Sequence, residues 1–197
     1  MSSLHRLVLG TGNPGKIEEL EALLSDLSID LVPSHDLDVP PDVVEDASTL
    51  AGNAEKKAHA FHEHTSLPAL ADDTGLEVAA LDGRPGVHTA RFAGPGATPN
   101  DNKKRLLEVL DGVDDRRARF RTVVALIDAD GSTHTFEGIC PGTITTGPRG
   151  DQGFGYDPLF QPEGHDTTFA EMPPEAKNEI SHRRKALDTL RQFLSEE

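Results

Sequence analysis

The alternation of apolar and polar positions predicts strands that alternate with helices. Residues 4–10 form an apolar run that ends in glycine, as expected of a buried first strand. Isoleucine and leucine then recur at helical spacing from Ile17 to Leu27, with Glu18, Glu19 and Glu21 predicted to face solvent. The same reasoning predicts strands at 29–32, 67–71, 119–128 and 133–145, and helices from Ser48 or Thr49 to about His64, over 102–110 and over 181–193. This order is typical of an α/β protein.

The organisation of the chain favours one domain with a cleft between two lobes. The glycine- and proline-rich stretch 82–99 is too long for a plain connection, and 147–158 is a second glycine-rich loop. No internal repeat, low-complexity tract or long linker divides the 197 residues, and this length suits one domain. We therefore interpret residues 1–197 as a single α/β domain.

Composition and charge restrict the class of protein. The chain is 36% hydrophobic and 27% charged, and 34 acidic residues against 19 basic ones give a net charge of -15. Such a surface repels nucleic acid polymers, whereas a small phosphate ligand can still bind where cations are local and a divalent metal assists. The acid excess also fits adaptation to a salty cytoplasm, and the composition alone does not decide whether this is its cause.

The sequence also indicates where the protein works. No apolar run approaches the ~20 residues that a membrane span needs, and the N-terminus does not resemble a cleavable signal. The single cysteine, Cys140, excludes an internal disulfide framework. We therefore expect a cytoplasmic protein that does not bind membranes.

A phosphate-binding loop is predicted between the first strand and the first helix. Residues 10–16 read Gly-Thr-Gly-Asn-Pro-Gly-Lys, and at a strand–helix junction the backbone N–H groups and the helix dipole favour an anion. Lys16 adds a positive charge, but Ile17 occupies the Ser or Thr position that binds magnesium in a Walker A loop. A triphosphate loop is favoured over a standard NTPase or kinase, and the alternative is a tight turn with a solvated lysine.

Two adjacent carboxylates follow the apolar run 67–71. In extended backbone, Asp72 and Asp73 point to opposite sides, so one can face a ligand while the other orients it or binds metal through a local bend. Oxygen ligands of this kind suit Mg²⁺, and Glu45 or Asp46 could supply a partner carboxylate. The alternative is an exposed acidic turn.

Two further segments carry candidate ligand-binding residues. Residues 150–158 combine glycines with Phe154 and Tyr156, which indicates a backbone close to a flat ligand with an aromatic ring against a base. The alternative is a glycine-rich hairpin whose aromatic rings pack in the core. Ser181 is a good N-cap for the last helix, and the cations after it lie at the positive end of the helix dipole. That conflict indicates a binding site, unless these cations form a solvated basic face.

Taken in order, four motifs resemble those of the inosine triphosphate pyrophosphatase family. They are Thr-Gly-Asn-Pro-Gly-Lys at 11–16, Ala-Asp-Asp-Thr-Gly-Leu at 71–76, Gly-Phe-Gly-Tyr-Asp-Pro at 153–158 and Ser-His-Arg at 181–183. The resemblance runs from the first strand to the last helix. It implies a magnesium-dependent homodimer with a long mixed β-sheet, flanking helices and an active-site cleft between lobes. The implied reaction converts ITP, dITP or XTP to the nucleoside monophosphate and pyrophosphate.

The resemblance also implies a role for each motif residue. Asp73 would be the proton acceptor and a metal ligand, with Asp72 and Glu45 close to the same Mg²⁺ and with Lys16 assisting catalysis. Water would attack the α-phosphorus directly. The residues implied to bind the triphosphate are Thr11, Gly12, Asn13, Pro14, Gly15 and Lys16, and those implied to contact the rest of the substrate are Thr74, Phe154, Gly155, Tyr156, Asp157, Lys177, His182 and Arg183.

Two alternatives to this function stay open. One is a pyrophosphatase for modified pyrimidine triphosphates or for GTP, and the other is a nucleotide-binding sensor without turnover. Preference for hypoxanthine and xanthine would come from donors to the 6-oxo group, such as Arg183 and backbone N–H groups. Lys16 together with two carboxylates favours an enzyme, because binding alone does not need the second carboxylate.

Overall fold

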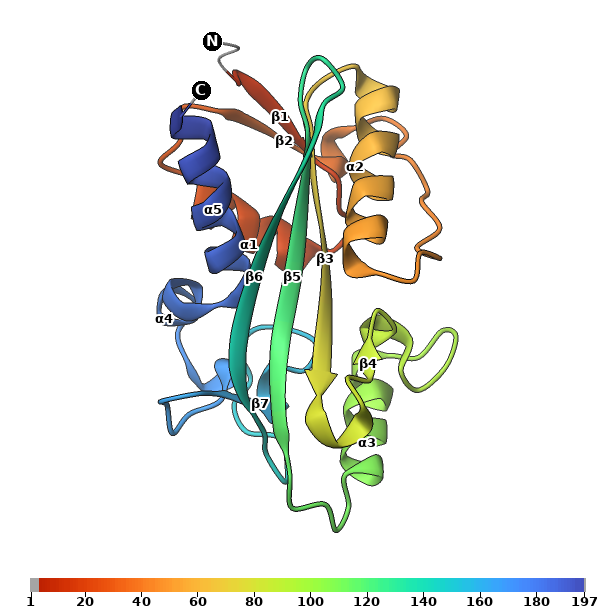
Figure 1. Cartoon of the computed structure of the whole chain (residues 1–197), viewed down its shortest axis with the longest axis vertical. Coiled ribbons are helices and arrows are strands. Elements are labelled where there is room, and N and C mark those ends of the chain that lie inside the picture. The colour runs from red at the N-terminus through yellow and green to blue at the C-terminus, as the bar shows by residue number, and fades with distance from the viewer. Residues whose placement is uncertain (1–3, 197) are drawn as a thin grey trace. The chain divides into compact units, whose positions relative to one another are not determined.

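The computed structural model describes residues 4–196 and confirms an α/β fold around a long mixed sheet with flanking helices (Figure 1). The chain divides into two compact units. The first comprises the chain up to Asp73, Thr122–Gly138 and the segment from Arg183 onward, and the second comprises Thr74–Arg121 and Ile139–His182. The single domain and the cleft expected from the sequence stay predictions.

Three strands contribute residues to both units. The sheet order is β2 (Asp30–Pro33), β1 (Arg6–Leu9), β3, β5, β6 and β7 (Phe160–Pro162), with β4 (Pro85–Gly86) paired to β3. The shared strands are β3 (Ala69–Val78), β5 (Arg117–Ile127) and β6 (Thr133–Ile144). The predicted turn at Asp128 to Gly131 joins β5 to β6, and Gly131 adopts the positive φ of 85° that such a turn needs.

In the first unit, helices cover both faces of the sheet (Figure 1). β1 pairs in parallel with β2 and with the beginning of β3. The remaining elements of this unit are β1 (Arg6–Leu9), β2 (Asp30–Pro33), α1 (Pro14–Leu24), α2 (Leu50–Thr65) and α5 (His182–Glu196), with a 3₁₀ turn at Ser34–Asp36.

Alternation along β1 explains these layers. Leu7 and Leu9 point to one face, where they pack with apolar residues of α1 and α5. Val8 points to the other face and packs against Phe61 of α2. Leu7, Val8 and Leu9 are all buried, so this part of the strand is covered on both sides, as its apolar run predicted.

The first helix begins earlier than the sequence pattern predicted. α1 starts at Pro14, whereas the predicted loop extended to Lys16. The Asn13 side chain accepts hydrogen bonds from the N–H groups of Gly15 and Lys16, at 3.0 and 3.3 Å. Pro14 has no N–H group to leave unsatisfied at the first helical position. A side-chain cap and a proline therefore start the helix directly after Asn13.

The acidic motif lies inside a strand rather than after one. The prediction that the strand ends at Ala71 was wrong, because β3 continues to Val78. Asp72 and Asp73 are therefore central strand residues, and both are buried. Carboxylates at such positions require polar partners on both faces of the sheet.

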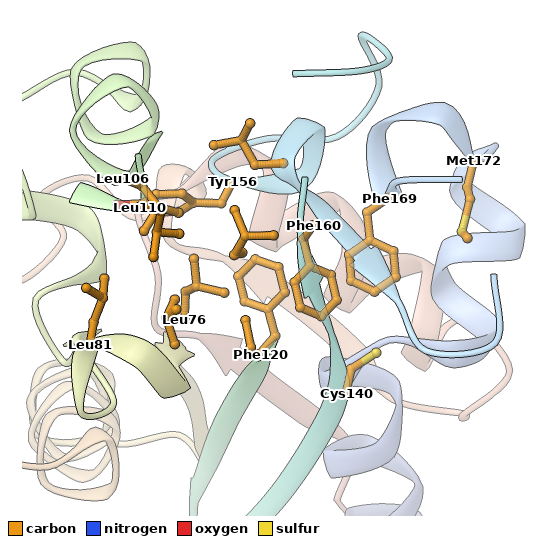
Figure 2. Close-up of a cluster of buried hydrophobic side chains, with 14 residues drawn as sticks. Leu76, Leu81, Leu106, Leu110, Phe120, Cys140, Tyr156, Phe160, Phe169 and Met172 are labelled. Atoms are coloured by element: carbon orange, nitrogen blue, oxygen red, sulfur yellow. The ribbon is translucent and has the colours of Figure 1, made fainter. Parts of the chain in front are cut away.

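The second unit packs around an aromatic core (Figure 2). The Phe160 ring lies between the rings of Phe120 and Phe169, with centroid distances of 4.6 and 5.1 Å. β4 pairs antiparallel with the far end of β3, and β7 pairs antiparallel with β6. The elements of this unit are β4 (Pro85–Gly86), α3 (Pro99–Val109), β7 (Phe160–Pro162) and α4 (Pro174–Ile180), with 3₁₀ turns at Ala79–Leu81, Thr89–Arg91, Asp157–Leu159 and Phe169–Glu171.

Capping side chains begin two of the predicted helices. Thr49 accepts a hydrogen bond from the N–H of Gly52 at the start of α2, which confirms the predicted helix start. Thr98 and Asp101 form a reciprocal capping box at the start of α3, a few residues before the predicted beginning. Among residues 4–196, no helix is both long and apolar enough to cross a membrane.

Replacing Gly142 by Ala should destabilise the protein. An added Cβ at Gly142 would lie 2.3 Å from the Gln161 carbonyl oxygen and 2.7 Å from the Phe160 ring, where β6 pairs with β7. Because overpacking forces backbone shifts, we expect the free energy of unfolding to fall by about 1–3 kcal/mol in urea denaturation. Gly147→Ala is the matched control, because its Cβ would meet no atom within 4 Å. Equal losses in both variants would contradict this packing.

Candidate active site

Asp72 is a buried carboxylate held between two cations. The Lys16 ammonium lies 3.1 Å from Asp72 Oδ2, and Arg183 Nη2 lies 2.9 Å from the same oxygen. Lys16 also donates to the main-chain carbonyl of Asp72 at 3.3 Å. The Arg183 guanidinium forms a second ion pair with Glu19. This network joins α1, β3 and α5 on one face of the sheet.

These contacts determine the protonation states of the network. Burial acts to raise the pKa of the Asp72 carboxyl, but Lys16 and Arg183 outweigh burial and hold this pKa well below its usual range. Burial also lowers the pKa of the Lys16 ammonium, and Asp72 opposes that shift. Asp72 is therefore an anion at physiological pH whose charge is balanced within the protein.

Asp73 faces the other side of β3, as expected for adjacent residues in extended backbone. Its Oδ2 accepts a hydrogen bond from Asn53 at 3.0 Å, and its Oδ1 lies 3.8 Å from the Lys57 ammonium. The same ammonium pairs with Glu45 Oε2 at 2.9 Å. Asn53 and Lys57 reach this site together because they lie one turn apart on α2. Glu45 is thereby held next to Asp73.

The environment of Asp73 makes it a stronger base than an ordinary aspartate. Burial raises the pKa of the Asp73 carboxyl above its ordinary value of 3.8, and Glu45 adds to this rise. Lys57, Lys16 and Asn53 oppose the shift without cancelling it. The pKa values of two adjacent carboxyls are thus pushed in opposite directions, an arrangement typical of acid–base sites.

The carboxylates of Asp73 and Glu45 are of the chemical type that binds magnesium. Both carboxylates approach one ammonium group, that of Lys57, so their oxygens lie around a common position for positive charge. Mg²⁺ usually takes one or two protein carboxylates and keeps several waters. In the described part of the chain, no group of three or more His, Cys, Asp or Glu residues is arranged to hold a metal. Asp73 and Glu45 supply the two carboxylates that such ligation needs, whereas Asp46 pairs with the exposed Lys56 at 2.6 Å.

The loop before α1 uses several of its own polar groups. The Thr11 hydroxyl accepts a hydrogen bond from the N–H of Asn13 at 3.3 Å. The Asn13 side chain in turn accepts hydrogen bonds from the N–H groups of Gly15 and Lys16. Gly12 is exposed. Two of the N–H groups expected to bind phosphate, those of Gly15 and Lys16, are therefore capped by Asn13, and the Lys16 ammonium is the group of this loop best suited to meet an anion.

In the second unit, three of the predicted substrate-binding residues form one cluster. Lys177 donates to Asp157 Oδ2 at 2.6 Å, and the same oxygen accepts the N–H of Phe154 at 2.9 Å. The Lys177 ammonium lies 4.9 Å from the centre of the Phe154 ring. Gly153 permits this arrangement, since a Cβ there would lie 2.2 Å from the Asp157 carboxylate and its φ is +70°. This buried ion pair shapes the glycine-rich loop.

Other predicted substrate-binding residues pack against the aromatic core. Tyr156 is buried and donates its hydroxyl hydrogen to the Thr89 carbonyl at 3.1 Å, and burial raises the pKa of its phenol. The His182 ring stacks on Phe120 with a centroid distance of 4.6 Å. Thr74 follows Asp73 in β3. Substrate contacts by these residues stay predictions, as does a contact by Gly155, which has a φ of +59°.

Comparison with known proteins identifies the family. The Ham1 family profile matches residues 7–193. The chain belongs to the Ham1 family. It is 48% identical over 192 residues to a dITP/XTP pyrophosphatase of Porphyromonas gingivalis. This alignment covers 97% of this chain and 98% of that protein. It is 46% identical over 191 residues to a dITP/XTP pyrophosphatase of Geobacter sulfurreducens, with 96% of each chain covered.

Solved structures of Ham1 proteins have the same fold. The structure of a HAM1 protein from Coxiella burnetii matches with a TM-score of 0.87 and 42% identity, covering 98% of this chain and 100% of that one. A dITP/XTP pyrophosphatase from Mycobacterium abscessus matches with a TM-score of 0.75 and 37% identity, covering 94% of this chain and 98% of that one. Similarity over nearly the whole length supports the confirmed α/β fold.

Three residues of this Ham1 site were missed in the sequence: Glu19, Asn53 and Lys57. The prediction that Glu19 faces solvent was wrong, because it pairs with Arg183 and its side chain is only 12% exposed. Asn53 and Lys57 lie on the buried face of α2, and their spacing within an apolar stripe was a signal that could have revealed them. The cation Arg183 at the start of α5 is explained by its two carboxylate partners, Glu19 and Asp72.

Asp72→Asn should destabilise this Ham1 protein far more than Asp73→Asn. Neutralising Asp72 leaves Lys16 and the buried Arg183 without their shared anion, so the free energy of unfolding should fall by about 3–5 kcal/mol. Neutralising Asp73 should cost far less, because its raised pKa means that the folded protein disfavours the charged form. Urea denaturation at neutral pH compares the two. A larger loss for Asp73→Asn would contradict the assigned charge states.

The two carboxyls should also respond oppositely to pH. The pKa of Asp72 is lower in the folded protein, so its contribution to stability is present above the unfolded value of 3.8 and is lost as the pH falls toward the folded value. The pKa of Asp73 is higher when folded, so its ionisation costs stability as the pH rises through that raised value.

Lys57→Gln should raise the pKa of Asp73 further. The ammonium of Lys57 lowers this pKa and lies 3.8 Å from the carboxylate, so its removal favours the protonated form. Carbon-13 NMR titration of the Asp73 carboxyl measures the change. Lys56→Gln is the control, because Lys56 pairs with exposed Asp46 instead. An unchanged Asp73 titration in Lys57→Gln would refute the contact.

Proposed function

We propose that this protein hydrolyses the non-standard purine nucleoside triphosphates ITP, dITP and XTP to the nucleoside monophosphate and pyrophosphate. The observation that carries the proposal is the pair of adjacent buried carboxylates, Asp72 bound by Lys16 and Asp73 held next to Glu45 by the shared Lys57 ammonium. The identity of nearly one half to dITP/XTP pyrophosphatases supports this assignment of substrate.

The residues of the first unit suit water attack on the α-phosphorus. Phosphoryl transfer depends on positioning and charge stabilisation more than on covalent help. Lys16 stabilises the triphosphate charge and is held by Asp72. Asp73 accepts the proton of the attacking water, for which its raised pKa suits it. Lys57 positions both Asp73 and Glu45.

We propose that Glu45 and Asp73 hold Mg²⁺. The bound metal would neutralise charge on the phosphates. Asp72 could also lie near the ion, and a direct contact stays a prediction. The pairing of Asp72 Oδ2 with Lys16 and Arg183 supports a different contribution, which is to hold these two cations in place.

Contacts with the base by the glycine-rich loop and by Arg183 are proposals that rest on the sequence motifs. The Asp157–Lys177 pair shapes the loop that carries Phe154, whose half-buried ring could stack on a flat base. Arg183 would donate to the 6-oxo group while Asp72 and Glu19 hold its guanidinium. The remaining contacts proposed for the substrate are those of Thr11, Gly12, Asn13, Pro14, Gly15, Thr74, Gly155, Tyr156 and His182.

We further propose a cytoplasmic homodimer that does not bind nucleic acid polymers. The net charge of -15 supports the exclusion of polyanions. Sedimentation at twice the chain mass would support the dimer, and sedimentation at the mass of a single chain would disprove it.

Pyrophosphate release from ITP, XTP, dITP, GTP and ATP, with and without Mg²⁺, tests the function. We expect fast release from the first three, little from GTP or ATP, and none without metal. Equal rates on all five would keep the catalytic assignment and reject the base preference. Preference for GTP or modified pyrimidine triphosphates would favour the rival substrate class. Binding without turnover would indicate a sensor.

Asp73→Asn should lower kcat by about 10²–10⁴, because general-base help is of this size. The control is Asp46→Asn, which makes the same change at an exposed carboxylate paired with Lys56, and it should keep wild-type kcat. Near-normal turnover by folded Asp73→Asn would remove Asp73 from its proposed role.

A further inference from the structure

The second unit contains a pocket whose residues take no part in the proposed reaction. Its volume is about 500 Å³. It is lined by the end of β6, the loop 145–149 that follows, Gln161 of β7, and Arg116 just before β5. In the described chain, residues 4–196, no Asp or Glu side chain lines this pocket. For a protein with a net charge of -15, such a lining is a local exception.

Arg116 places a rigid positive charge in the pocket. Its Nε donates to the carbonyl of Ile144 at 2.7 Å, its Nη1 to that of Leu110 at 2.8 Å and its Nη2 to that of Thr145 at 2.8 Å. These acceptors are neutral, so they fix the guanidinium without balancing its charge. A guanidinium has five N–H donors, and three of them bind these carbonyls. Among the described residues the other two have no acceptor, so they remain for a ligand. A half-buried, preorganised cation of this kind favours an anion.

The remaining lining adds donors around this charge. Arg149 is held by Gln161 Oε1 at 3.0 Å and by Glu171 at 3.3 Å, so its charge is already balanced in part. Thr143 and Thr146 are exposed residues of the same lining and carry hydroxyl donors. Guanidinium and hydroxyl donors together suit the several acceptor oxygens of a phosphate group.

We propose that this pocket binds the phosphate group of a small molecule, with Arg116 as the main charge and Thr146 and Arg149 as additional donors. The shared chemistry is a phosphate oxyanion, which can come from inorganic phosphate or from a nucleotide. Binding here uses none of the residues that the proposed hydrolysis requires.

The test is an NMR titration of ¹⁵N-labelled protein with inorganic phosphate, against sodium chloride at equal ionic strength. The amide signals of Thr146 and Gly147 report on the pocket directly. We expect saturable shifts with a Kd on the order of millimolar, and none with chloride. Because turnover is not measured, the result is independent of the enzymatic proposal.

Two variants at one exposed position separate charge from shape. Thr146→Glu adds a carboxylate to the pocket and should weaken phosphate binding by about tenfold or more. Thr146→Gln adds an uncharged side chain of the same size as glutamate and replaces the hydroxyl donor by an amide donor, so it should weaken phosphate binding clearly less than Thr146→Glu. Arg116 is not the first choice for mutation, because its carbonyl contacts also support the fold.

Parallel titrations identify the source of the phosphate. Tighter binding of inosine monophosphate than of inorganic phosphate would support a nucleotide ligand, and equal binding would support free phosphate. Absence of saturable shifts at Thr146 and Gly147, or equal weakening by Thr146→Glu and Thr146→Gln, would overturn the proposal.

Discussion

The candidate site depends on the ion pairs that the buried carboxylate of Asp72 forms with two cations. It joins Lys16 and Arg183, which come from opposite ends of the chain, through one oxygen atom. The two cations could not share this position without an anion between them, and loss of one partner of a buried ion pair is strongly destabilising. The charge that a triphosphate would meet at Lys16 is therefore positioned by folding, before any ligand binds.

The geometry of β3 then gives the neighbouring carboxyls of Asp72 and Asp73 different pKa values. Alternation along β3 turns Asp72 toward α1 and α5 and Asp73 toward α2. One carboxylate meets two cations and holds its charge tightly, while the other meets an amide, one lysine and the carboxylate of Glu45. A single strand thus supplies both a charge-holding anchor and a candidate base, without any movement of the backbone.

In the second unit, the local charge differs from the overall charge of the chain. The chain is strongly acidic, yet Lys177 is buried against Asp157, and Arg116 lies in a pocket that no Asp or Glu side chain among residues 4–196 lines. Burial reduces the screening of such charges by solvent and salt, so a few fixed cations can attract phosphate groups in spite of the surrounding acid.

The sequence by itself determined the α/β class, the family and the opposite orientation of Asp72 and Asp73, because periodicity, ordered motifs and strand alternation are local properties. Only the tertiary structure decided that β3 continues through the acidic pair, and that Glu19, Asn53 and Lys57 complete the site. These contacts join segments far apart in the chain, and a polar side chain looks the same in the sequence whether its partner is water or a buried charge.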